Sequence, residues 1–441
     1  MKDKLLQLEQ EMQELKGQIS AVEQAQKAQA AAAVSPVTPP PSAPPATPAP
    51  SGPQAVAEKP PKETGVGKTS LDVYGYAMMD MGYDFKTNDP NWFDVVRPTK
   101  LPSFNGEFAP NGKVYFGVRQ TRFGVTSSTP TRFGDLKTQF EFELFGTGVD
   151  AGQTTFRLRH AYGELGQFGA GQTWSPFMDI DVFPNSIEYW GPTGMVFFRN
   201  VQFRWMPVRS DRSRVIVALE RPGASADQGI YSDRIELQGV KPKFNAPDVS
   251  GQLRIMRGWG YLQLAGIFRK ISWVDTNNDP FNLSDTVYGW GVNVTSNVKF
   301  GSNDVGKFAV VYGHGIQNYM NDAPVDVAIK NNFQNPITPI KGVPLPVLGV
   351  VSFLDHNWSK YFTSSIGYSM INIDNSNAED ANDFHQGHYA LTNLLYHPVP
   401  TVTIGSEFQF GRRLNFSDGF NVNDYRLQFS FKYDWRKGLE F

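Results

Sequence analysis

The chain has 441 residues, no cysteine and a formal net charge of −2. A charge so close to zero gives no indication of a nucleic-acid partner, and the lack of cysteine excludes a disulfide framework and thiol chemistry. Aromatic residues make up 13% of the chain, yet no run of about 18 apolar residues occurs, which excludes a transmembrane helix but suits strands with one apolar and one polar face.

Residues 1–33 are predicted to form a helix with a narrow apolar seam. The seam positions are spaced alternately by three and four residues, as in a coiled coil. They are Leu5, Leu8, Met12, Leu15, Ile19 and Val22. A lone amphipathic helix docked on another surface is the alternative, and nothing in the seam fixes the number of strands. The segment begins with charged residues rather than a signal peptide, so we expect an exported protein to be numbered from its mature form.

Residues 34–69 are predicted to be an extended, semi-rigid linker. Eleven prolines interrupt any helix or strand in this segment. Near its end, residues 65–70 are similar to the tail of a phosphate-binding loop. Lys62 stands where that loop requires its first glycine, and no strand precedes it, so the linker interpretation is preferred.

Residues 70–441 are predicted to form an all-β domain of repeated amphipathic strands. In residues 136–144, for example, apolar side chains alternate with Lys137, Gln139, Glu141 and Glu143. The predicted strands lie near 70–81, 113–125, 136–144, 155–163, 169–173, 197–206, 212–220, 251–256, 260–273, 287–300, 306–318, 347–356, 361–371, 388–396, 401–410 and 424–434. An even number of about sixteen strands indicates a transmembrane antiparallel β-barrel, and residues 435–441 are expected to be a tail unless the last strand runs longer.

The connections between the predicted strands differ in length. Short ones occur at 207–211, 301–305 and 398–400, and long ones at 82–112, 174–196, 221–250 and 319–346. Outer-membrane barrels have short periplasmic turns and long external loops, and an even strand count places both chain ends in the periplasm. The alternative from another class is a soluble or surface β protein with a structural or adhesive role, made trimeric by its N-terminal helix.

Strand alternation also predicts which charged side chains face the lumen. The basic ones are Lys137, Arg157, Arg159, Arg204, Arg212, Arg214, Arg254, Arg269, Arg426 and Lys432. The acidic ones are Glu141, Glu143, Glu220, Glu407 and Asp434. Arg119 and Arg122 are three residues apart and cannot both face inward without a bulge, and Arg122 is the better candidate. A surplus of basic residues predicts a lumen that attracts anions, unless the charges pair with one another across the barrel.

The long connection 174–196 is predicted to fold into the barrel, because it is too apolar to extend into solvent. Its carboxylates are Asp179, Asp181 and Glu188. They are expected to face an arginine wall formed by Arg157 and Arg159 and to create a transverse field at a constriction. A cap over the barrel mouth and a contact between subunits are the alternatives.

The sequence offers little support for a metal site or for catalysis. His385 and His388 lie in an acidic loop, but such loops are usually only solvated, and no metal site is expected. The histidines are scattered, and no nucleophile and base have convincing spacing. We therefore expect neither a cofactor nor enzymatic activity.

Several segments resemble the DcaP-like outer-membrane porins. They are residues 119–124 (RQTRFG), 140–146 (FEFELFG), 157–163 (RLRHAYG), 171–178 (GQTWSPFM) and 405–411 (GSEFQFG). The resemblance implies a trimeric, sixteen-stranded barrel in the Gram-negative outer membrane that passes small anions such as dicarboxylates. It also implies a periplasmic N-terminal coiled coil, and it matches Arg119, Arg122, Arg157 and Arg159 to the family's inner arginine motifs. Phosphate-selective porins are the rival identity.

The expected partners follow from that interpretation. They are two further copies of the chain, outer-membrane lipid and lipopolysaccharide, small anionic solutes and a periplasmic partner of the coiled coil. The candidate lumen residues are Arg119, Arg122, Arg157, Arg159, Arg204, Arg214, Arg269 and Arg426.

Overall fold

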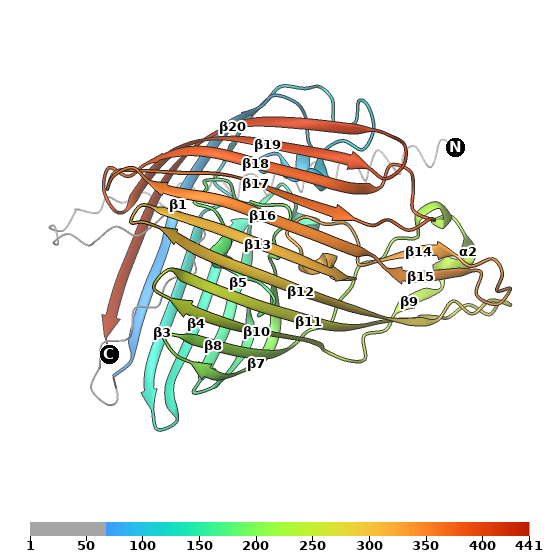
Figure 1. The fold of residues 1–441 in the computed structure, drawn as a ribbon, viewed down its shortest axis with the longest axis horizontal. Coiled ribbons are helices and arrows are strands. Elements are labelled where there is room, and N and C mark those ends of the chain that lie inside the picture. Colours follow the sequence, from blue (N-terminus) through green and yellow to red (C-terminus); the bar gives the residue numbers. More distant parts are fainter. Residues whose placement is uncertain (1–67, 441) are drawn as a thin grey trace, which may run out of the picture. The chain divides into compact units, whose positions relative to one another are not determined.

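The computed structural model describes residues 68–440, which form a closed barrel of sixteen antiparallel strands (Figure 1). The strands of the barrel wall are β1 (Ser70–Asp84), β3 (Arg122–Thr131), β4 (Gly134–Phe145), β5 (Thr154–Leu165), β6 (Phe168–Trp174), β7 (Arg199–Arg209), β8 (Ser213–Glu220), β10 (Asp248–Arg257), β11 (Gly260–Asp275), β12 (Asp285–Phe300), β13 (Asp304–His314), β16 (Pro346–Asn357), β17 (Phe362–Ile373), β18 (Phe384–Tyr396), β19 (Val402–Asn415) and β20 (Asn421–Glu440). Each pairs with its neighbours in this order, and β20 closes the wall by pairing with β1 from Ser70↔Glu440 to Asp84↔Arg426.

The remaining elements are short. The strands are β2 (Lys113–Gly117), which pairs with β1, β9 (Val240–Pro242), which pairs with β11, and the hairpin of β14 (Val327–Asn331) and β15 (Ile340–Pro344). In residues 68–440 the structure has one α-helix, α2 (Ile235–Gln238). It also has six 3-10 turns, at Pro90–Trp92, Pro98–Lys100, Gly148–Asp150, Ile180–Val182, Gly229–Tyr231 and Gln317–Tyr319. None of the helices in the described part of the chain has the length and apolar character needed to cross a membrane.

The all-β barrel and its sixteen strands confirm the sequence prediction, with two corrections. The predicted strand 113–125 is two strands, because Thr121 N–H donates to the Val118 carbonyl in a turn that interrupts it. The predicted tail is wrong for residues 435–440, which continue β20 in register with β1. The predicted coiled coil and nearly all of the linker lie outside the described residues.

The two ends of the barrel differ as the connections predicted. Both described chain ends lie at the end with short turns, such as 166–167, 210–212 and 301–303. The long connections, including 221–247 and 315–345, lie at the other end, where β9, α2, β14 and β15 project beyond the wall (Figure 1). This division is typical of an outer-membrane barrel with periplasmic termini and extracellular loops.

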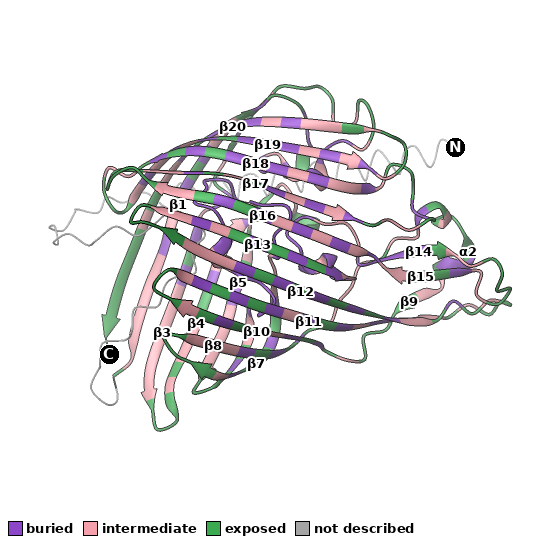
Figure 2. Cartoon of the chain, in the orientation of Figure 1, coloured by how far each residue is buried: buried purple, intermediate pink, exposed green. Residues whose placement is uncertain are grey.

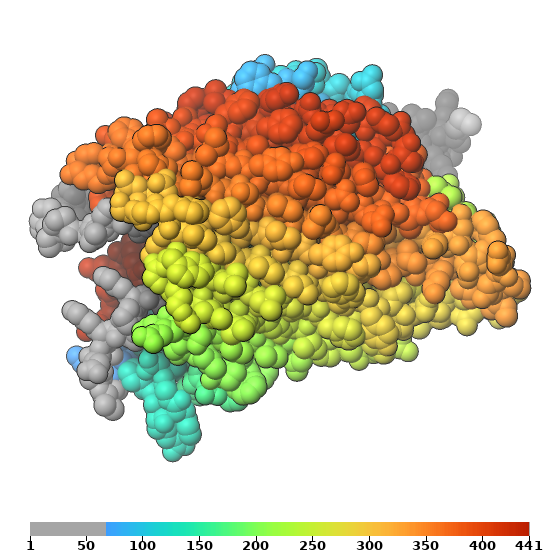
Figure 3. All heavy atoms as spheres, viewed as in Figure 1, coloured from blue at the N-terminus to red at the C-terminus, as the bar shows by residue number. Residues whose placement is uncertain are grey.

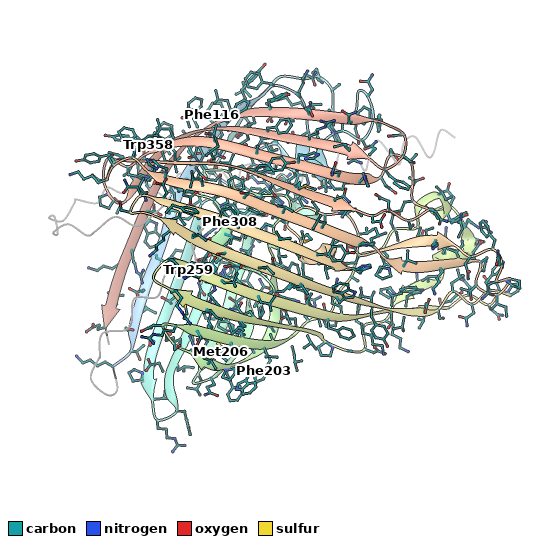
Figure 4. All side chains as sticks on the ribbon, viewed as in Figure 1. Phe116, Phe203, Met206, Trp259, Phe308 and Trp358 are labelled. Carbon is teal, nitrogen blue, oxygen red and sulfur yellow. The ribbon has the colours of Figure 1, made fainter. Side chains whose placement is uncertain are left out.

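The outer wall carries many exposed apolar side chains. The side of the barrel seen in Figure 3 is a continuous surface of atoms. Exposed and buried residues alternate along its strands (Figure 2), and the exposed ones include Phe203 and Phe308, which project from the wall in Figure 4. Met206, on the same strand as Phe203, is buried. Apolar side chains exposed over the whole circumference require lipid around them, so a soluble β protein is a poor description of this surface.

An apolar core fills part of the barrel interior. Residues 175–198, between β6 and β7, are almost entirely buried. Phe177, Val182 and Phe183 from this inner loop belong to one cluster with wall residues such as Val311 on β13 and Val351 on β16. Burial of this surface holds the inner loop against β11–β18. Buried polar and charged side chains also line the wall from β20 through β1 to β8, among them Asp80, Arg122 and Arg159.

Candidate functional site

A β-bulge on β5 shapes the polar wall. Glu141 pairs with His160 while Phe142 pairs with Leu158, so Arg159 is the extra residue. Arg159 and His160 are consecutive, yet both are buried inside the barrel. A bulge re-aims side chains in this way and reverses the alternation that follows it. Arg157, by contrast, points inward through ordinary pairing with Glu143.

Four arginines surround two carboxylates at this point of the wall. We call them the arginine cluster, which consists of Arg122, Arg157, Arg159 and Arg199 with Glu141 and Glu143. Arg159 bridges both carboxylates, with Nε 2.5 Å from Glu141 Oε1 and Nη1 2.5 Å from Glu143 Oε2. The other three arginines lie 3.5–3.6 Å from carboxylate oxygens. The cluster therefore carries more positive than negative charge.

The surplus arginines of the cluster have unused hydrogen-bonding capacity. Within residues 68–440, no hydrogen-bond partner exists for Nε of Arg122, Nη1 of Arg157 or Nη1 of Arg199. Arg157 is the most accessible of the four, with 25% of its side chain exposed. Guanidinium N–H groups buried without partners are costly, so the cluster is suited to accept a further anion.

Arg204 and Arg214 extend the basic wall toward the short-turn end. Arg204 Nη2 donates to the Trp174 carbonyl and to Gln202 Oε1, both of which are neutral acceptors. Arg214 lies directly opposite Arg254 in the register of β8 and β10. Among the described residues neither Arg204 nor Arg214 forms an ion pair, so both keep their positive charge available to the lumen.

Three other predicted lumen arginines are enclosed instead. Arg119 pairs with Asp94 and lies 3.8 Å from the Phe145 ring centre. Arg269 and Arg426 are fully buried. Arg269 is held by Asp248 and Asp326, and Arg426 by Asp84 and the Phe93 carbonyl. They point into the barrel, but their side chains have almost no exposed surface for a solute.

The carboxylates of the inner loop do not face the cluster. Asp179 accepts hydrogen bonds from Arg254, from Tyr261 Oη at 2.7 Å and from Thr295 Oγ1. Asp181 also pairs with Arg254. The two aspartates therefore share Arg254 on the β10–β12 wall, and the predicted field between them and Arg157 and Arg159 is not formed.

Glu188 lies nearer the cluster but contributes little negative charge. Its carboxyl group accepts from the backbone N–H groups of Val96 and Gly191 and is almost completely buried. Burial raises the pKa of Glu188 to about 8, so the group is mostly protonated at neutral pH. Glu188 and Arg122 together line a cavity of about 30 Å³, which is close to the volume of one water molecule.

The predicted two-to-one surplus of inward basic residues is wrong for the barrel as a whole. Carboxyl groups outnumber arginines among the buried charged residues of the described chain, because segments between strands contribute Asp94, Asp322 and Asp326. Arg212, counted as inward, lies in an exposed turn. The positive surplus is instead local to the arginine cluster, Arg204 and Arg214.

Arg199 is the functional candidate that the sequence missed. Alternation with Asn200 and Gln202, which face inward, assigns it to the outer face. It is nevertheless only 5% exposed, and its guanidinium carbon lies 4.8 Å from the Trp174 ring centre. No sequence signal marks this position, because the side chain of the first residue of a strand can point to either face of the sheet.

No metal site accompanies these residues. Between residues 68 and 440, no group of three or more His, Asp or Glu side chains is arranged to hold a metal ion. His385 bonds to Asn375, and His388 bonds to Tyr368.

Comparison with known proteins shows which family the chain belongs to. The sequence model of the DcaP outer membrane protein family matches residues 54–434. The chain belongs to this family. No curated protein sequence matches it. The DcaP assignment confirms the resemblance found in the sequence and places the barrel in the outer membrane.

Solved structures agree on the fold of this DcaP family member. The outer membrane channel DcaP of Acinetobacter baumannii has a TM-score of 0.68 at 19% identity, covering 83% of this chain and 97% of that one. An anion-selective porin from Comamonas acidovorans has a TM-score of 0.54 at 10% identity, covering 83% and 100%. A loop-deletion mutant of OmpT from Vibrio cholerae has a TM-score of 0.51 at 13% identity, covering 83% and 99%.

Proposed function

We propose that this DcaP family member is a porin that passes small anionic solutes, dicarboxylates first among them, by passive diffusion. The observation that carries the proposal is the arginine cluster, where four guanidinium groups face two carboxylates and three N–H groups have no hydrogen-bond partner among the described residues. A carboxylate or phosphate fits such a group because the planar guanidinium can donate two parallel hydrogen bonds.

The arrangement of the remaining basic residues supports diffusion rather than tight binding. Arg204 and Arg214 offer further positive charge between the cluster and the short-turn end of the barrel. An anion that leaves one site then meets another, so binding at each site is weak and exchange is fast. A solute with two carboxylates carries two groups that such arginines can bind, which is the reason for placing dicarboxylates before phosphate.

The first prediction concerns ion selectivity. In planar bilayers under a salt gradient, we expect a reversal potential of the sign that indicates anion preference. Succinate is expected to block the current at lower concentration than phosphate does. A cation-selective sign would contradict the proposal, while stronger block by phosphate would identify a phosphate-selective porin instead.

We also propose that the chain forms a homotrimer through its barrel wall. Strand β2 pairs with β1 on one side, and no strand of the described chain pairs with its other edge. Val114 and Phe116 on β2 are 68% and 65% exposed, more than most outward side chains. Lipid cannot satisfy the N–H and C=O groups of an open strand edge, so a second copy of the chain is the partner that fits it.

The second prediction separates this wall contact from the predicted periplasmic coiled coil. Deleting residues 1–64 is expected to leave a trimeric, conducting barrel, as measured by size-exclusion chromatography with light scattering in detergent. Phe116→Arg in the full chain is expected to lower the trimer fraction, whereas Phe308→Arg, on the distant β13, serves as the matched control. Monomers after the deletion would show that the N-terminal helix holds the subunits together.

A further inference from the structure

The outer wall changes character toward the loop end of β17–β20. Successive rows of paired outward positions are first mainly apolar, then rich in aromatic rings, then mainly polar, with Arg412 as the charged residue. The rows are Ile366, Thr392, Phe408 and Leu427; Tyr368, Ala390, Phe410 and Tyr425; and Met370, His388, Arg412 and Asn423. A belt of aromatic side chains marks the boundary between lipid tails and headgroups in outer-membrane barrels. The third row, which we call the Arg412 row, therefore lies at the depth of the outer-leaflet headgroups.

Arg412 brings an uncompensated charge to this row. Its Nη2 donates weakly to Asn421 Oδ1 at 3.3 Å, and no described residue supplies a partner for its Nε. No carboxylate from residues 68–440 forms an ion pair with it. The neighbouring Asn423 Oδ1 also lacks a partner among these residues. A cation on a lipid-facing wall is costly unless an anion neutralises it, so the counter-charge has to come from outside residues 68–440.

We propose that the Arg412 row binds a phosphate group of a phosphorylated glycolipid in the outer leaflet. The guanidinium supplies a planar fork for phosphate oxygens. His388, which bonds to Tyr368 Oη, adds a polar group beside it in the same register. The acyl chains of the same lipid then lie along Phe410 and Phe408 below the row. The phosphate of the lipid thus contacts the Arg412 row, and its acyl chains contact the apolar and aromatic rows next to it on the same wall.

This site is separate from the lumen. Arg412 faces outward, whereas the next residue, Arg413, is buried inside and donates to Asn415 Oδ1 and the Asn382 carbonyl. Lipid binding at Arg412 therefore does not depend on which solute passes through the barrel. The proposal stands whether or not the channel prefers anions.

The test uses the full chain, purified in detergent and freed of lipid, with bisphosphorylated lipid A as the probe. We expect this lipid to raise the temperature at which the barrel loses its folded gel mobility, and lipid A stripped of phosphate to do so much less. Arg412→Gln is expected to weaken the binding of the phosphorylated lipid on the order of tenfold, because a charge-assisted contact is lost. Arg412→Lys keeps the charge but not the planar pair of N–H donors. Its affinity for the phosphorylated lipid is expected to lie between those of the wild type and Arg412→Gln.

Arg257→Gln is the matched control, since Arg257 is an exposed arginine beside a short turn at the opposite end of the barrel. It is expected to bind like the wild type. Equal binding by Arg412→Gln and the wild type would overturn the proposal, as would an equal effect of phosphate-free lipid A or of inorganic phosphate alone. Dissociation of the Arg412→Gln oligomer in lipid-free detergent would also overturn it, because the row would then be a contact between subunits.

Discussion

Replacing Arg122, Arg157 and Arg199 together with glutamine is expected to weaken the proposed anion preference of the channel strongly. The cluster then retains only Arg159 against Glu141 and Glu143, so its net charge changes from positive to negative. A unit charge about 6 Å from an ion in water is worth roughly 0.7 kcal/mol, or about threefold in the local ion concentration for each arginine removed. Three such changes together amount to about thirtyfold, while Arg204 and Arg214 keep their positive charge, so the reversal potential is expected to move far toward the cation-selective side.

The measurement is the reversal potential under a salt gradient, with the trimer fraction recorded for each variant. Arg159 stays in place, so both carboxylates keep their shortest ion pairs and the wall is expected to assemble. The matched control replaces Arg119, Arg269 and Arg426 singly, because these arginines are enclosed and paired. Their loss is expected to affect stability more than selectivity. An unchanged reversal potential in the triple variant would show that the solute path avoids the cluster.

Strand alternation was sufficient to predict most of the barrel wall. On β7, Asn200, Gln202 and Arg204 face inward and Val201 and Phe203 face lipid, as their pattern indicated. The reason is that a lipid-facing residue and a water-facing residue differ strongly in transfer free energy, so the two faces must alternate. The bulge at Arg159 was not predictable, because its two inward residues depend on the pairing with β4.

Charge pairing between distant segments was the part that the sequence could not supply. Arg254 pairs with Asp179 and Arg269 with Asp326, partners that come from segments between strands rather than from the wall. Counting charges on strands alone therefore overestimated the positive surplus. The family resemblance named Arg119, Arg122, Arg157 and Arg159 together, but only their contacts separate the enclosed Arg119 from the accessible Arg157.

Glu143→Gln is expected to destabilise the barrel by about 3–5 kcal/mol, the usual cost of removing one partner from a buried ion pair. The Glu143 side chain is completely enclosed, and it receives Arg159, Tyr189 Oη and the more distant guanidinium groups of Arg157 and Arg199. After the change to glutamine, Glu141 is the one carboxylate that remains in the cluster to balance the positive charges of the arginines. Urea unfolding of the barrel in lipid vesicles, followed by tryptophan fluorescence, measures the loss.

Glu164→Gln provides the matched control, because Glu164 pairs with Arg209 on the same side of the barrel but both side chains are partly exposed. Its cost is expected to stay below about 1 kcal/mol. Equal costs for the two variants would contradict the view that Glu143 holds the cluster together. Any Glu143→Gln barrel that folds is expected to prefer anions more strongly than the wild type. The two carboxylates thus reduce the positive charge offered to solutes, and in return they allow four arginines to remain side by side in the wall.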